Sequence, residues 1–272
     1  MKNLWGNTGR SICLLLVLAA GFPIIGAAEI NPEAPTVLIT GTSRGIGLEF
    51  TRQYAALGWN VIATCRRPDE ADALAGLAAD YPNVTIEQLD VLRHDMVDAL
   101  AKKYKKQPID VLLNVAGFFG DNLQMRGSFF SKLNYDLWDL YVHTNAIGPL
   151  KMAEAFFDSV KMSEQKKIMT VSSLQGSIEA SYGPGSFFYR GSKAALNMFM
   201  HTLAEQSKVK NSGVLVGLFS PGLIIDDRTR NLPLEGKVER PISVSGMIDV
   251  IENFTPEMTG GFYKYSGETV PW

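Results

Sequence analysis

The chain has 272 residues, 46% of them hydrophobic, and carries a formal net charge of −2. This length allows one domain with a full core, and the near balance of charge excludes a strongly basic nucleic-acid-binding protein. Cysteine occurs only at Cys13 and Cys65, and removal of an N-terminal leader would leave Cys65 alone, so the cysteines do not identify the compartment.

Residues 1–28 have the layout of a secretory signal peptide. A basic start precedes an uncharged run, residues 11–28, which ends in the small residues Gly26 and Ala28 at a candidate cleavage point. The sequence therefore predicts export to a periplasmic or secreted location. The alternative is an uncleaved anchor that tethers the protein to a membrane, because the run approaches the roughly 20 apolar residues that cross a bilayer. Pro23 and two glycines weaken that alternative.

Residues 29–35 contain two prolines and predict a linker into one folded domain, residues 36–272. Within the domain, short apolar runs alternate with segments of helical periodicity, which is typical of βαβ units. The runs cover residues 36–40, 60–65, 84–90, 110–117, 167–173 and 213–222. Their apolar and polar residues do not alternate cleanly, as expected when helices cover both faces of a sheet.

These elements predict an α/β fold, a single-domain Rossmann-type doubly wound parallel sheet of about seven strands with helices on both faces. The helical segments cover residues 45–58, 70–81, 96–106, 137–160 and 189–208. In such a sheet, ligands bind beyond the carboxyl ends of the strands. The candidate functional residues are therefore sought at the strand ends.

The first strand-like run is followed by TGTSRGIG, Thr40–Gly47, directly before a helical segment. Its glycines let the backbone approach a pyrophosphate, whose charge is favoured by the N-terminus of the next helix. The loop predicts a dinucleotide site, with a purely structural turn as the alternative. The residues assigned to this site are Gly41, Ser43, Arg44, Gly45, Ile46 and Gly47.

The end of the second run indicates which dinucleotide is bound. Cys65 stands where an NAD enzyme carries an acid, and Arg66 and Arg67 follow it. Arginine can hold a 2′-phosphate through its planar fork, and Arg44 is expected nearby in space. The sequence therefore favours NADP(H), and the alternative is that these arginines form a solvated surface.

Two further strand ends are consistent with a cofactor site. Asp90, followed by Val91, could accept a hydrogen bond from an adenine amino group. At the next strand end, Asn114 precedes Ala116 and Gly117, whose small size allows the backbone to lie close to an adenosine.

Tyr189 precedes Lys193 by four residues at the head of a helical segment, which places both side chains on one helix face. A phenol has a pKa of about 10, so it is a slow proton donor unless a cation stabilises its phenolate. Ser173 ends the fifth run, where its hydroxyl could bind a substrate carbonyl. Asn145 is a polar residue in an apolar helix pattern and needs a hydrogen-bonding partner when buried. The alternative is that Tyr189 packs in an aromatic stripe and Lys193 extends to solvent.

Together these residues resemble the short-chain dehydrogenases/reductases, whose nucleotide loop is TGxxxGxG and whose catalytic tetrad is Asn, Ser, Tyr and Lys. By motif match, the tetrad falls on Asn145, Ser173, Tyr189 and Lys193. The match from about residue 36 to residue 272 also assigns cofactor contacts to Tyr189, Lys193, Pro221, Gly222 and Ile224. The segments ATCRRP, SSLQGSI, YRGSKAALN and GGFYKYSGETVPW are similar to the sniffer and C-factor group of carbonyl reductases.

The resemblance implies that NADPH gives hydride to a ketone or aldehyde of a small or hydrophobic substrate. Tyr189 would act as general acid, Lys193 would lower its pKa and anchor the ribose, Ser173 would orient the carbonyl, and Asn145 would hold a water that relays protons. Two other functions stay open. One is a non-catalytic NADP(H)-binding regulatory or signalling protein, and the other is an NAD(P)-dependent alcohol dehydrogenase working in the oxidative direction.

The sequence departs from the family pattern at Val115, which replaces a second Asn, and at Asp226, where a threonine is usual in the subgroup. Residues 223–244 are expected to form the substrate lid and pocket. The three histidines lack metal-ligand spacing, so no metal site is predicted. Many relatives pair through the helices that here contain Asn145 and Tyr189, which predicts a homodimer, with a monomer as the alternative.

Overall fold

The computed structural model describes residues 30–120, 130–180, 183–227, 229–231 and 233–272, and the predicted signal peptide lies outside this part of the chain. A seven-stranded sheet with every neighbouring pair parallel forms the centre of the domain, in the order β3-β2-β1-β4-β5-β6-β9. The strands are β1 Thr36–Thr40, β2 Asn60–Cys65, β3 Val84–Gln88, β4 Val111–Asn114, β5 Lys167–Val171, β6 Leu215–Ser220 and β9 Phe262–Lys264. The predicted fold class is confirmed.

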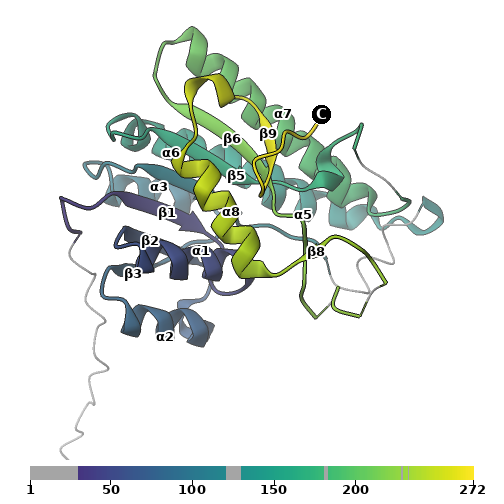
Figure 1. Cartoon of the computed structure of the whole chain (residues 1–272), viewed down its shortest axis with the longest axis horizontal. Coiled ribbons are helices and arrows are strands. Elements are labelled where there is room, and N and C mark those ends of the chain that lie inside the picture. Colours follow the sequence, from purple (N-terminus) through teal and green to yellow (C-terminus); the bar gives the residue numbers. More distant parts are fainter. Residues whose placement is uncertain (1–29, 121–129, 181–182, 228, 232) are drawn as a thin grey trace, which may run out of the picture.

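Helices cover both faces of the sheet (Figure 1). Their bounds are α1 Gly45–Ala56, α2 Asp72–Asp80, α3 His94–Lys103, α5 Trp138–Val142, α6 Gly148–Lys161, α7 Phe187–Val209 and α8 Arg240–Glu252. One core lies under α1, α2 and α8 and includes Tyr54 and Met247. The other lies under α3, α6 and α7 and includes Phe156 and Leu196. The strands have apolar residues on both sides because each side faces one of these cores.

The sheet order reverses between β1 and β4. The chain runs from β1 to β2 and β3 on one side, and then crosses so that β4 pairs with β1 on the other side, with Ile39 opposite Leu113. At such a reversal the loops after the two strands separate and leave a crevice beyond their carboxyl ends. The glycine loop after β1 and residues 115–120 after β4 lie at this position.

Residues 223–244, predicted to form only a lid and pocket, contain more regular structure than expected. Two short parallel strands, β7 Leu223–Ile224 and β8 Lys237–Val238, pair with each other, and residues 240–244 begin α8. Pro241 suits the first turn of a helix, where its missing N–H is not needed. Within the described residues, no helix is long and apolar enough to cross a membrane.

Candidate active site

The glycine loop lies directly against the end of β4. The Thr40 hydroxyl accepts hydrogen bonds of 3.0 Å from the backbone N–H groups of both Val115 and Ala116. Gly41 has φ +75°, and a Cβ there would lie 2.7 Å from the Ala116 Cα. A side chain at position 41 would therefore be strained and would also collide with backbone, which explains the glycine.

The loop leaves an open, electropositive site at the start of α1. Gly45 has φ +65°, and a Cβ there would meet nothing within 4 Å. No side chain caps the helix, and its first turn contains no acid. The N–H groups of that turn, together with the exposed Arg44, fit an anion such as a pyrophosphate. Ser43 and Ile46 flank this site in the loop and the first turn, respectively.

Contacts between β1 and β2 bring the predicted phosphate-binding arginines to one edge of the sheet. The carbonyl of Thr64 accepts hydrogen bonds from the N–H groups of Gly41 and Thr42, so the loops after the two strands start together. Arg44 and Arg66 are exposed and make no ion pair with another described residue. Arg67 instead lies 2.8 Å from the Glu70 carboxylate. The structure thus leaves Arg44 and Arg66 available for a 2′-phosphate, whereas Arg67 is engaged locally.

The next two strand ends differ in what their side chains do. One carboxylate oxygen of Asp90 accepts a 3.0 Å hydrogen bond from the Leu92 N–H and closes a turn. Val91 is 7% exposed and packs against Gly148, so its side chain belongs to the core. Asn114 is also buried, and its Nδ2 lies 3.4 Å from the Thr170 hydroxyl of β5.

Lys193, the cation of the predicted tetrad, is buried. Only 5% of it is exposed, and its Nζ donates a 3.0 Å hydrogen bond to the carbonyl of Val171 at the end of β5. Burial lowers the pKa of Lys193 to about 8, because the charged form loses its hydration. The alternative of a solvated lysine is therefore wrong.

Asn145 lies in a π-helical turn, His143–Ile147, between α5 and α6. Its Oδ1 accepts a 2.6 Å hydrogen bond from the Phe118 N–H, and its Nδ2 donates to the Phe118 carbonyl at 2.8 Å and to the Ser192 hydroxyl at 2.9 Å. The Ser192 hydroxyl donates in turn to the Tyr189 carbonyl at 2.8 Å. Both amide hydrogens of Asn145 are thus used to join the β4 loop to the head of α7.

This arrangement modifies the predicted role of Asn145. A water that accepts a hydrogen bond from its side chain would have to displace Phe118 or Ser192, because both amide hydrogens are already used. A π turn often interrupts a helix at a functional position because it changes which main-chain groups are paired.

Gly117 lies where the groups of the predicted tetrad approach one another. A Cβ at this position would lie 3.5 Å from Asn145 Oδ1 and 3.8 Å from Lys193 Nζ. The half-buried Tyr189 ring meets the Phe119 ring edge-to-face, with centroids 4.6 Å apart. The loop after β4 therefore contacts Asn145 and Tyr189 and passes close to Lys193.

Ser173 comes to the same region from β5. It begins a short 3₁₀ turn, Leu174–Gly176, and its hydroxyl accepts a 3.2 Å hydrogen bond from the Gln175 N–H. This turn lies on α7, since a Cβ on Gly176 would be 2.9 Å from the Lys193 Cβ. The half-buried hydroxyl of Ser173 is therefore held at the carboxyl end of the sheet, next to the helix that bears Tyr189 and Lys193.

The segment after β6 also lies at this end of the sheet. Gly222 has φ +77°, and a Cβ there would be 3.1 Å from the Tyr265 ring. Pro221 accepts a 2.6 Å hydrogen bond from the Ser243 hydroxyl, and Ile224 is part of β7. Asp226 accepts a 3.1 Å hydrogen bond from the Thr229 N–H, so its carboxylate stabilises a local turn.

The sequence analysis misses three contributors to this site: Phe119, Tyr141 and Ser192. Tyr141 donates a 2.8 Å hydrogen bond to the Phe119 carbonyl and so helps to fix the β4 loop. The signal for Phe119 is an aromatic pair, Phe118 and Phe119, directly after a strand end and Gly117. No comparable signal marks Ser192, because its contacts depend on the π turn.

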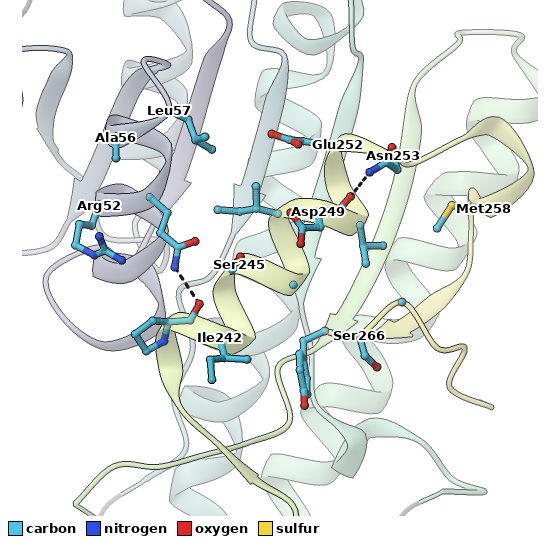
Figure 2. A pocket seen from close by; sticks show the side chains of 17 residues that line it. Arg52, Ala56, Leu57, Ile242, Ser245, Asp249, Glu252, Asn253, Met258 and Ser266 are labelled. Atoms are coloured by element: carbon cyan, nitrogen blue, oxygen red, sulfur yellow. Dashed lines mark hydrogen bonds between the residues drawn. The ribbon is translucent and has the colours of Figure 1, made fainter.

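A groove of about 1090 Å³ lies elsewhere, between α1 and α8 (Figure 2). Its walls include the exposed side chains of Leu57 and Ile242, and Gln53 crosses it to donate a 3.0 Å hydrogen bond to the Pro241 carbonyl. None of the predicted catalytic or cofactor-binding residues lines this groove, and only Pro241 and Ile242 of the predicted lid segment, residues 223–244, do so. Among the described residues, no group of three His, Cys, Asp or Glu side chains could hold a metal ion.

Comparisons with known proteins agree with this geometry. A sequence profile of the family described as short chain dehydrogenase matches residues 35–235. The chain is 33% identical over 244 residues to 1-hydroxy-2-glutathionyl-2-methyl-3-butene dehydrogenase of Rhodococcus sp. (strain AD45), covering 87% of this chain and 99% of that protein.

Among solved structures, the chain is similar to the NADPH-bound carbonyl reductase from chicken fatty liver, with a TM-score of 0.79, 29% identity and coverage of 88% of this chain and 99% of the other. It is also similar to the carbonyl reductase Sniffer of D. melanogaster, with a TM-score of 0.77, 25% identity and coverage of 88% and 100%. The chain therefore belongs to the short-chain dehydrogenase family of oxidoreductases, and its similarity to these two structures supports the predicted resemblance to the sniffer group.

Proposed function

We propose that this protein is an NADPH-dependent reductase that transfers hydride to the ketone or aldehyde carbonyl of a small or hydrophobic substrate. The observation that supports it most strongly is the buried Lys193, one helical turn after Tyr189 and beside Gly117 at the reversal point of the sheet. A buried ammonium is costly and needs a reason. Stabilising a phenolate and binding a ribose would supply one.

The mechanism assigns one task to each side chain. NADPH, when bound, supplies the hydride. The Ser173 hydroxyl donates a hydrogen bond to the substrate carbonyl oxygen, and the Tyr189 hydroxyl gives its proton to that oxygen as negative charge develops there. The ammonium of Lys193 favours the phenolate that Tyr189 becomes, and Asn145 fixes the loop after β4 against α7.

Selection of NADP(H) is assigned to Arg44 and Arg66. Both lie at the strand ends where the adenosine half of a dinucleotide binds in this fold, and neither is paired with another described residue. The chicken carbonyl reductase was solved with NADPH, and a short-chain dehydrogenase/reductase from Burkholderia multivorans that is 28% identical to this chain was solved with NADP. These neighbours support the same coenzyme here.

The proposal is tested by measuring NADPH oxidation with a panel of quinones, diketones and aldehydes, on protein that lacks residues 1–28. We expect turnover with at least one class and loss of most turnover in Tyr189→Phe, with NADPH affinity retained. A protein that binds NADPH but oxidises none of it with the panel would be a non-catalytic NADP(H)-binding protein. Turnover only with alcohols and NAD(P) would indicate the oxidative direction.

We also propose that residues 1–28 export the protein to a periplasmic or secreted location and that the helices containing Asn145 and Tyr189 form a homodimer. The uncharged run at residues 11–28 supports the first, and the apolar residues of α7 support the second, among them the exposed Met198. Fractionation of cells and mass measurement of the exported chain test the first. Sedimentation of the purified protein tests the second.

A further inference from the structure

The last residues of the chain bind the turn that follows catalytic Ser173. We refer to residues 270–272 as the strap and to residues 173–180 as the catalytic turn. The Ser177 hydroxyl donates to the carbonyl of Pro271 at 2.7 Å, and the Glu179 N–H donates to the carbonyl of Trp272 at 2.9 Å. Ser177 is only 1% exposed, whereas Glu179 and Trp272 are exposed, so the strap contacts extend from the protein interior to its surface.

The strap is held on its other side by β9 and α7. Val270 donates a 2.7 Å hydrogen bond to the Phe262 carbonyl of β9. The Trp272 ring stacks on the Phe262 ring with centroids 5.9 Å apart, and it meets the His201 ring of α7 at 5.3 Å. The C-terminal end of the chain lies beside these two elements (Figure 1). The strap therefore connects a rigid part of the domain to the catalytic turn.

In the described residues, hydrogen bonds hold the catalytic turn at its start, middle and end, and the strap supplies those at the end. At its start, the Leu174 N–H donates to the Ser220 hydroxyl of β6 at 3.1 Å. In the middle, the side chain of Asn197 donates to the Gly176 carbonyl at 3.1 Å. At its end, Ser177 binds the strap and also accepts a 2.9 Å hydrogen bond from the Ala180 N–H.

We infer that Ser177 and the strap are positioning residues for the reaction, because they fix the end of the turn whose first residue is Ser173. Among the described residues, no hydrogen bond or ring contact joins the strap to the loops at Gly41, Arg66 or Gly117, so its effect is expected on the substrate side of the site and not on the coenzyme side. The expected effect on turnover rests on the proposed reductase function. The expectation that the strap fixes residues 177–180 does not depend on that function.

The test uses four variants of the full chain. Ser177→Ala removes the hydroxyl that binds the strap, and deletion of Pro271 and Trp272 removes the acceptors. Trp272→Phe keeps both the acceptors and an aromatic ring. Ser266→Ala is a matched control, because Ser266 is an exposed serine beside β9 that bonds only to Glu268 among the described residues.

Loss of one or two of these hydrogen bonds should lower kcat/KM for the carbonyl substrate about three- to tenfold in Ser177→Ala and in the deletion variant. NADPH affinity, measured by fluorescence titration without substrate, should not change. Trp272→Phe and Ser266→Ala should behave as wild type. The two lesions share the bond between Ser177 and the strap, but Ser177→Ala also removes the acceptor of the Ala180 N–H and the deletion also removes the acceptor of the Glu179 N–H. The combined variant should therefore lose less than the sum of the two single losses.

Hydrogen exchange gives a readout that does not need turnover. The amides of Glu179 and Ala180 should exchange faster in Ser177→Ala and in the deletion variant, while the amides of β5 stay protected. Unchanged exchange at Glu179 and Ala180, additive kinetic losses, or an equal loss of NADPH affinity would overturn the inference. A wild-type chain that turns over no substrate would overturn the proposed function, and the exchange data would still decide whether the strap holds the turn.

Discussion

Lys193 shows how a single residue links burial to both stability and chemistry. Its amine is almost fully covered by protein, and its hydrogen bond to the Val171 carbonyl compensates only part of the lost hydration. The protein therefore gives up some stability at neutral pH to keep a cation beside Tyr189. Such a cost is typical of residues retained for function.

The stability of the protein should reveal this cost when pH is varied. The pKa of Lys193 is about 8 in the folded protein and 10.5 in the reference state, so between these values the unfolded chain binds the additional proton. The free energy of unfolding should then rise with pH across this window, by up to roughly 3 kcal/mol from this group. Urea titrations at pH 7, 8.5 and 10 would measure the rise. It should be absent in Lys193→Met, and parallel curves for the two proteins would contradict it.

The arginines at the strand ends make a second residue-scale prediction. Arg66→Ala should weaken NADPH binding by about tenfold or more and leave NADH binding unchanged, because hydrogen bonds to a phosphate are charge-assisted. Arg67→Ala is the matched control, since Arg67 is paired with Glu70, and it should have a much smaller effect. Equal effects of the two substitutions on both coenzymes, in binding titrations, would mean that neither arginine selects NADP(H).

At the scale of elements, the π turn at His143–Ile147 and the head of α7 act as one unit. The Asn145 side chain donates a hydrogen bond to the Ser192 hydroxyl, and this hydroxyl donates to the Tyr189 carbonyl. Because Ser192 is fully buried, no water can readily replace its hydroxyl. The position of the Tyr189 phenol therefore depends on the contact with the π turn as well as on the helix that carries it.

Ser192→Ala should leave a buried Asn145 amide hydrogen without its partner. Unsatisfied buried donors cost about 1–3 kcal/mol, so the variant should be less stable by that amount. Chemical denaturation of the variant and the wild type measures the difference. Ser266→Ala, on an exposed turn, should stay within about 0.5 kcal/mol of wild type. A Ser192→Ala protein as stable as that control would show that the Asn145 contact contributes nothing.

The sequence identifies those elements whose signal is local. All six apolar runs form strands, because strands covered on both faces need continuous apolar residues. The glycine loop and the Tyr189–Lys193 spacing are likewise local patterns. The sequence analysis does not predict α8, since its apolar residues are distributed around the helix, with Val244 and Met247 in the core and Ile242 exposed. The three-residue β9 and the π turn are set by tertiary packing and leave no periodic signal.

The tetrad shows the same division between local and tertiary information. Motif spacing predicts Asn145 and Lys193 as members of the tetrad. Only the structure shows that the Asn145 side chain is already hydrogen-bonded to Phe118 and Ser192. The same holds for the arginines, where Arg67 differs from Arg66 only because Glu70 lies within reach. Sequence patterns thus indicate the candidate residues of the site, and packing determines which contacts each of them makes.

At the scale of the whole molecule, the sheet separates two hydrophobic cores. Side chains pack so closely at its interior positions that larger residues do not fit. Gly217 in β6 lies opposite Met169 of β5, and a Cβ there would be 2.7 Å from the Phe254 ring and 2.9 Å from the Met169 sulfur. The aromatic ring of Phe254 fills the volume that a side chain at position 217 would need. The Phe254 ring and the glycine of β6 therefore fit each other in size at this point.

Gly217→Ala should destabilise the protein by about 1–3 kcal/mol, because the added methyl group overpacks the core. Gly76→Ala offers a control of opposite sign. Gly76 lies within α2, and a Cβ there would meet nothing within 4 Å, so alanine should stabilise the protein by about 0.5–1 kcal/mol. Thermal unfolding of both variants measures the signs. A gain in stability from Gly217→Ala would mean that Phe254 moves away without penalty.

The position of Trp272 determines where an affinity tag can be added without disturbing the site. A tag or fusion partner joined after Trp272 would start next to Ser177 and Glu179. It would disturb the hydrogen bonds that fix the turn after Ser173. A handle placed ahead of Ile30 would instead emerge where Asn31 is bonded to Asn60, at the start of β2. A lower activity measured on C-terminally tagged protein would then be an effect of the tag and not a property of the enzyme.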